Sequence, residues 1–173
     1  GTTGLPKGAP RDTVSPFASA QLADRVPFPR KGTMVIVSPI FHSTGWATYL
    51  AGAALGNKVV TGRRFNAENT LKMIAEHKAD MLVAVPTMLH RMVELGPEVH
   101  GKYDTSSLKV ILVAGSALSP ELSNRTQDVF GDGLVHVADR MDDAIALAVE
   151  LAETDVDDVA GTGVVITGSV VSA

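Results

Sequence analysis

Short runs of branched apolar residues alternate with segments of helical character along much of this chain, and this alternation limits the possible folds more than any other feature. Each run is bounded by glycine, proline or charged residues, as expected of a buried strand. Strands that alternate regularly with helices are typical of a parallel sheet. We therefore predict an α/β fold with a mostly parallel sheet and helices on both faces. The strands are expected at Met34–Ser38, Lys58–Thr61, Met81–Val85 and Val110–Ala114.

The segments between these strands carry start and stop signals of helices. Asn66 and Ser119 are residue types that cap helices, and Pro120 follows Ser119 at a first helical position. The segment Thr44–Leu55 is small and apolar enough to be a buried helix. The pattern is Rossmann-like, and in such folds ligands gather beyond the carboxyl ends of the strands. The helices are expected over Thr44–Leu55, from Asn66 to near Lys78, through Met88–Val93 up to Gly96-Pro97, and from Ser119 onward.

Composition indicates one compact domain and excludes several classes of function. The 173 residues, 45% of them apolar, are enough for one sizeable core, so a single α/β domain over residues 1–173 is expected. The formal charge of −4 gives no basic surface for nucleic acid or an anionic membrane. The absence of cysteine excludes disulfides and thiolate sites, and no apolar run is long enough to span a membrane. A cytoplasmic protein is expected.

The first eleven residues, Gly1–Arg11, combine glycines, threonines and a lysine in one short stretch. Glycine lets the backbone approach a ligand closely, amide and hydroxyl groups donate to phosphate oxygens, and Lys7 adds a positive charge. This composition predicts a phosphate-binding loop and hence a nucleotide. The alternative is a flexible chain end, because the spacing differs from the Walker pattern.

Four segments resemble, in order, the motifs of the adenylate-forming superfamily, which includes acyl-CoA synthetases, luciferases and peptide-synthetase adenylation domains. Gly1–Gly8 resembles the family's phosphate-binding signature, and Pro39–Gly45 resembles its Pro-x-Phe-His-x-x-Gly motif. Val85–Leu89 is similar to its Val-Pro-Thr segment, and Leu108–Ser119 to the strand and turn beside adenine. The resemblance covers residues 1–132 and is nearest in character to bacterial fatty-acyl-CoA ligases.

The resemblance implies a substrate, cofactors and site residues. In this family a carboxylate attacks the α-phosphate of ATP, which gives an acyl-adenylate and pyrophosphate, and coenzyme A then forms a thioester. ATP or AMP, Mg and CoA are therefore implied. The implied cofactor-binding residues are Thr2, Thr3 and Lys7 at the phosphates and Gly115, Ser116 and Ala117 at the adenine, and the implied substrate-binding residues are His42 and Trp46.

Each of these assignments has a structural alternative. His42 can instead be a histidine whose hydrogen bonds are satisfied at a strand end, and Trp46 can instead pack in the core. The Gly115–Ala117 turn can serve both as a connection and as a ligand contact. No metal site is predicted, because the remaining histidines lack the spacing of zinc ligands. These histidines are His77, His90, His100 and His136.

The resemblance changes after Asp132. The family would continue into a Tyr-Gly-x-Thr-Glu motif, whose glutamate helps to hold magnesium, but this chain continues with Leu134–Arg140. Residues 134–173 instead resemble a βαβ segment of folylpolyglutamate synthases, relatives of the Mur ligases, with Gly161–Val171 as a strand and turn. The sequence is therefore interpreted as a chimera joined near residues 131–135.

Three functions follow from this interpretation. The first is a fragment of an ATP-dependent acyl-CoA ligase, inactive alone and with at most weak nucleotide binding, because the magnesium glutamate and the lysine of the C-terminal domain are unmatched. The alternatives are a non-catalytic α/β scaffold and a fragment of a folylpolyglutamate-synthase-like ligase. An exposed edge of the sheet is expected to be available for pairing with a second copy.

Overall fold

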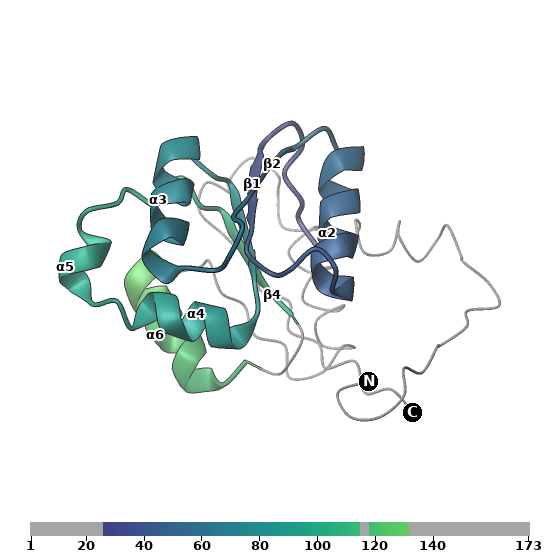
Figure 1. Ribbon diagram of the computed structural model, residues 1–173. Helices are drawn as coiled ribbons and strands as arrows, with labels where there is room; N and C mark the ends of the chain where they lie inside the picture. The colour runs from purple at the N-terminus through teal and green to yellow at the C-terminus, as the bar shows by residue number, and fades with distance from the viewer. Residues whose placement is uncertain (1–25, 115–117, 132–173) are drawn as a thin grey trace, which may run out of the picture.

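Four parallel strands form a sheet at the centre of the molecule (Figure 1). The computed structural model describes residues 26–114 and 118–131. Within them the strand order is β2-β1-β3-β4, so β2 and β4 are the outer strands of the described sheet. The predicted parallel α/β fold is confirmed, and each predicted strand is found within two residues of its expected ends. The strands are β1 (Thr33–Ile36), β2 (Lys58–Thr61), β3 (Met81–Ala84) and β4 (Val110–Val113).

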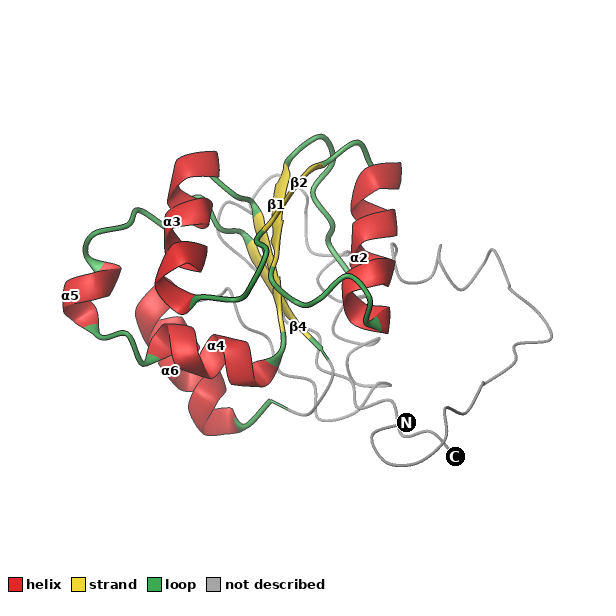
Figure 2. Ribbon diagram, in the orientation of Figure 1, coloured by secondary structure: helices red, strands yellow, loops and turns green. Residues whose placement is uncertain are grey.

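Helices cover both faces of the sheet, as predicted. Figure 2 shows α2 on one side of the strands and α3, α4 and α6 on the other. The short α5 follows α4 and was not expected from the sequence. None of the helices in the described ranges is both long and apolar enough to cross a membrane. The helices are α2 (Ser43–Ala54), α3 (Ala67–His77), α4 (Pro86–Val93), α5 (Pro97–His100) and α6 (Pro120–Phe130).

The strands alternate their side chains between two apolar layers. Val35, Leu82 and Ile111 point into the layer that α3, α4 and α6 complete, and all three are fully buried. Met34 and Met81 point into the other layer, against residues of α2. Because both faces of the central strands are buried, the strands read as continuous apolar runs in the sequence.

Two predicted helix caps are present. The Asn66 side chain accepts a hydrogen bond from the Asn69 amide at 2.8 Å, and Ser119 Oγ accepts one from the Leu122 amide at 3.2 Å. Each bond satisfies an amide that has no partner inside its helix. At the other end of α3, Lys78 adopts a left-handed conformation with φ of 46°, which ends the helix close to the predicted position.

The amino ends of three strands are joined through Asp80. Its carboxylate accepts a hydrogen bond from the Thr33 amide at 2.9 Å and forms an ion pair with Lys109 at 3.0 Å. The Asp80 amide donates to the Thr33 carbonyl at 2.9 Å. Partial burial acts to raise the pKa of Asp80, but the Thr33 amide and Lys109 outweigh it and hold that pKa below its ordinary value. Asp80 therefore links β1, β3 and β4 as a charged group.

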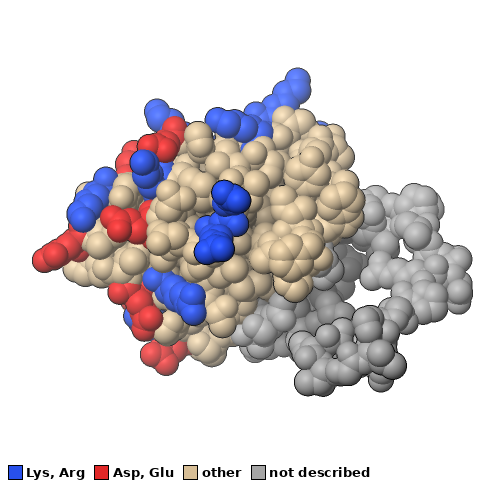
Figure 3. Space-filling view, in the orientation of Figure 1, with Lys and Arg blue, Asp and Glu red and all other residues tan. Residues whose placement is uncertain are grey.

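The prediction that the helix after β1 is buried was wrong. Trp46 and Leu50 of α2 are 52% and 47% exposed, whereas Gly45, Thr48 and Gly52 face inward and are buried. A helix that is apolar on all sides gives no sequence signal for the side that faces solvent. The exposed side of α2 carries no charged residue, and the surface above it in Figure 3 is nearly free of charge.

Candidate functional site

The carboxyl ends of β1 and β3 form a topological switch point. After β1 the chain turns to α2 on one face of the sheet, and after β3 it turns to α4 on the opposite face. The two adjacent strands stay joined up to this point, because the Val37 amide donates to the Val83 carbonyl at 3.0 Å. Connections that diverge in this way open a crevice in which α/β proteins bind ligands.

The loop from β1 to α2 is held in a tight turn against the helix that follows it. The His42 amide donates to the Pro39 carbonyl at 3.0 Å, and the Trp46 amide donates to the His42 carbonyl at 2.9 Å. A side-chain carbon at Gly45 would lie only 2.3 Å from the Pro39 oxygen. Only glycine therefore allows the loop and helix to approach this closely. His42 occupies the N-cap position, but its ring makes no capping hydrogen bond.

An open, mostly apolar pocket of about 470 Å³ lies at this turn. Phe41 is 87% exposed, and its ring lies 4.6 Å from that of His42 between centroids. The Trp46 ring stacks on Tyr49 at 6.0 Å. A large exposed aromatic surface is uncommon on a soluble domain and marks a place where a ligand or another surface binds. The pocket is lined by Ile40, Phe41, His42 and Trp46.

The structure brings two of the predicted site residues together and leaves the others outside its described ranges. His42 and Trp46, the predicted substrate residues, line the same pocket. The alternative that Trp46 packs in the core was wrong, since half of its surface is exposed. Leu118 is the first described residue after the segment predicted to flank adenine, and it is buried. The predicted nucleotide residues and the segment predicted to resemble folylpolyglutamate synthases, 134–173, lie outside the described residues; the nucleotide residues are Thr2, Thr3, Lys7, Gly115, Ser116 and Ala117.

Sequence reasoning missed two features near this pocket. It did not assign Phe41 to the site, although an aromatic residue just after a strand end was a signal for it. It also treated Ser38 as the end of a strand. Ser38 is only 2% exposed, and its hydroxyl has no hydrogen-bond partner among the described residues. The position of a polar residue at the end of an apolar strand could have indicated this feature from the sequence.

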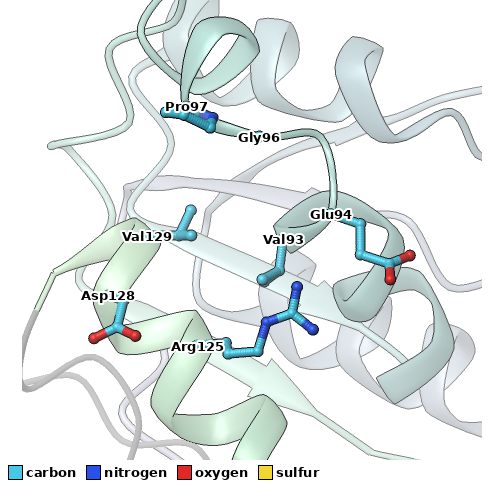
Figure 4. A pocket seen from close by; sticks show the side chains of 7 residues that line it. All are labelled: Val93, Glu94, Gly96, Pro97, Arg125, Asp128 and Val129. Atoms are coloured by element: carbon cyan, nitrogen blue, oxygen red, sulfur yellow. The ribbon is translucent and has the colours of Figure 1, made fainter.

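Two further hollows lie between α4 and α6, on the face of the sheet opposite α2. The larger, of about 640 Å³, is lined by Arg125 and Asp128 of α6 on one side and by Glu94 on the other (Figure 4). The smaller, of about 430 Å³, includes His90, which pairs with Glu94 at 3.2 Å. Within residues 26–114 and 118–131, no group of three histidines or carboxylates could hold a metal. The larger hollow is lined by Val93, Glu94, Gly96, Pro97, Arg125, Asp128 and Val129.

The chain is similar to CoA ligases. It is 30% identical over 125 residues to 4-coumarate--CoA ligase-like 3 of Arabidopsis thaliana, a match covering 70% of this chain and 22% of the relative. It is 27% identical over 140 residues to the medium-chain-fatty-acid--CoA ligase of Ectopseudomonas oleovorans, covering 79% of this chain and 25% of that protein. The chain thus spans about a quarter of the length of these relatives or less.

The fold is also found in a solved structure. The inhibitor-bound N-terminal domain of FACL13 from Mycobacterium tuberculosis matches with a TM-score of 0.58 and 20% sequence identity, over 64% of this chain and 27% of that one. The sequence model for AMP-binding enzymes matches residues 1–138, which include the segments at the switch point. The chain therefore belongs to the family of AMP-binding enzymes.

Proposed function

We propose that this chain is part of an ATP-dependent ligase that joins a carboxylic acid to coenzyme A, and that it supplies one wall of the acid-binding pocket. The observation that carries the proposal is the uncharged aromatic pocket at the switch point, directly after β1. The relatives are named as a 4-coumarate--CoA ligase-like protein and a medium-chain-fatty-acid--CoA ligase, and both named acids have a largely apolar body. This pocket offers the complementary surface.

The residues that line the pocket have two different roles in the proposed binding. Ile40, Phe41 and Trp46 provide apolar contact and exclude water from the body of the acid. His42 is the polar group of the pocket lining and is placed to orient the acid. The close contact between Gly45 and the Pro39 carbonyl fixes the turn that presents these groups. The binding is thus pre-organised by backbone packing.

We assign the nucleotide to two sequence segments that lie outside the described residues. Thr2, Thr3 and Lys7 have the donor groups and charge that hold phosphate oxygens, and Gly115, Ser116 and Ala117 come shortly after β4 in the sequence. ATP would supply the leaving pyrophosphate, and the protein would contribute positioning and charge rather than a nucleophile. Magnesium is assigned to no residue of this chain.

Fluorescence of Trp46, the sole tryptophan, tests the acid-binding wall directly. Titration with decanoate is expected to shift the emission to shorter wavelength as the acid covers the exposed ring. Phe41→Ser is expected to weaken binding about tenfold, because a large buried aromatic contact is lost. Leu50→Ser is the matched control, since Leu50 is an exposed residue of α2 that does not line the pocket. An equal loss in both variants, or no response to decanoate, would contradict the proposal.

A thermal melt with millimolar AMP tests the nucleotide segments separately. A ligand that binds only the folded chain raises its melting temperature. The increase is expected in the wild-type chain and is expected to disappear in Lys7→Ala. If neither AMP nor decanoate binds, the chain is a non-catalytic α/β scaffold instead.

A further inference from the structure

A buried hydroxyl without a partner among the described residues comes just before the turn that forms the proposed acid-binding pocket. Ser38 is 2% exposed, and its Oγ finds no hydrogen-bond partner among the described residues. Most buried polar groups in folded proteins are paired, because leaving one unpaired costs its full desolvation penalty. An unpaired hydroxyl in a native core therefore needs an explanation, and a bound ligand is one that fits its position.

The position of Ser38 follows from the alternation of β1. Met34 and Ile36 point into the layer beneath α2, whereas Val35 and Val37 pack against the opposite layer. Continuing this alternation carries Ser38 to the α2 face. The residue comes just after the end of β1 and just before Pro39, whose carbonyl oxygen is covered by Gly45 of α2. The hydroxyl is thus placed at the carboxyl edge of the sheet, beside the turn that forms the pocket.

Two other buried polar atoms lack partners within the described residues, and neither is near the pocket. Asn57 Nδ2 lies at the amino end of the sheet, where the same side chain accepts a hydrogen bond from the Gly32 amide. His100 Nε2 belongs to α5, and that ring packs edge-on against Phe130 on the opposite side of the sheet. Of these three, only Ser38 stands at the switch point where a ligand would bind.

We propose that Ser38 is a specificity-determining residue whose hydroxyl forms a hydrogen bond with an oxygen on the body of the acid. This inference rests on the proposed function, because it takes the pocket beside Ser38 to bind a carboxylic acid. The substrate class is then an oxygen-substituted apolar acid, such as a hydroxy acid, rather than a plain hydrocarbon acid. A hydrocarbon acid would cover the hydroxyl without pairing it, and sites built around a hydrogen bond discriminate against such analogues.

Isothermal titration calorimetry on the full chain with two matched pairs of acids tests this inference. The pairs are decanoate with 10-hydroxydecanoate, and 3-phenylpropanoate with 3-(4-hydroxyphenyl)propanoate. The hydroxylated member of one pair is expected to bind the wild-type chain about three- to tenfold more tightly, the range of a neutral hydrogen bond. Ser38→Ala is expected to abolish this preference and to retain binding of the unsubstituted acid. Ser123→Ala, a change at a buried serine on α6, is expected to leave the preference intact.

Thermal melts of the same variants give a second readout. Ser38→Ala is expected to be at least as stable as the wild-type chain, because it removes an unpaired buried hydroxyl. A clear fall in its melting temperature would show that the hydroxyl already has a structural partner and would overturn the inference. A preference that persists in Ser38→Ala, or equal binding of both members of each pair to the wild type, would overturn it while leaving the acid pocket intact. Failure of all four acids to bind would remove the proposed function as well.

Discussion

Replacing Gly45 by alanine is expected to destabilise the fold through one specific contact. The added carbon would lie 2.3 Å from the Pro39 oxygen, 2.8 Å from the Pro39 carbonyl carbon and 3.0 Å from Ile40 Cα. All three atoms belong to the backbone, so no side-chain rotation relieves the overlap. Either α2 or the Pro39–His42 turn has to move, and the turn carries the pocket.

The size of the effect follows from two opposing terms. Overpacking of a dense interior lowers the folding stability by about 1–3 kcal/mol. Because the contact at Gly45 is short and involves rigid backbone atoms, we expect a loss of about 3 kcal/mol. Alanine has a higher helix propensity than glycine, and this difference stabilises the variant by about 1 kcal/mol. The expected net loss for Gly45→Ala is therefore about 2 kcal/mol, or about 4–8 °C in melting temperature for a chain of this length.

Gly52→Ala provides the matched control on the same helix. Its added carbon would lie 2.7 Å from Met34 Sδ, an atom of a flexible side chain, and the next contact is at 3.4 Å. Here the strain of about 1 kcal/mol and the helical gain of about 1 kcal/mol nearly cancel. Urea unfolding followed by circular dichroism measures both variants. Equal stability of the two variants, or a Gly45→Ala chain as stable as the wild type, would refute the argument that backbone contact decides this position.

Two other substitutions test interactions that stabilise the fold away from the pocket. Asp80→Asn is expected to cost about 1 kcal/mol at pH 7, the difference between a charged and a neutral hydrogen bond to the Thr33 amide. Because the folded-state pKa of Asp80 is lowered, its contribution is complete above the unfolded-state pKa of about 3.9 and is lost as the pH falls through the folded-state pKa. Urea titrations should show a smaller difference in unfolding free energy between the wild type and Asp80→Asn at pH 3 than at pH 7. A difference that is the same at both pH values would contradict this. Asn66→Ala is expected to cost about 1 kcal/mol by removing the cap of α3, whereas Asn66→Asp should retain stability in the same unfolding assay.

The sheet was predictable because its signals are local. Each strand is a short apolar run closed by a breaking residue, and both faces of the central strands β1 and β3 are buried, so their runs carry almost no polar interruption. The caps at Asn66 and Ser119 were predictable for the same reason, since the accepting side chain and the donating amide lie within one turn. The short α5 escaped prediction because a single turn has no periodicity to detect.

The pocket was only partly predictable. Motif resemblance identified His42 and Trp46 from their neighbours in the sequence, and the structure places both at one pocket. The exposure of Phe41 and the unpaired hydroxyl of Ser38 depend on which segments cover them, and that is a property of tertiary packing. A sequence pattern shows residue types and their spacing, but it does not show which buried polar atoms lack partners.

The packing of α2 connects the stability of the fold to the proposed binding surface. The fully buried residues of α2, Gly45, Thr48 and Gly52, are small; Tyr49 is partly buried against the same core layer, and the large residues Trp46 and Leu50 are exposed. Small residues let the helix approach the sheet closely but bury little apolar area, so α2 gains less from its packing than the helices on the other face. A bound acid that covers Trp46 would bury additional apolar surface of α2. Binding should therefore slow amide hydrogen exchange in α2 more than in α3, because a ligand stabilises most the element whose apolar surface it completes.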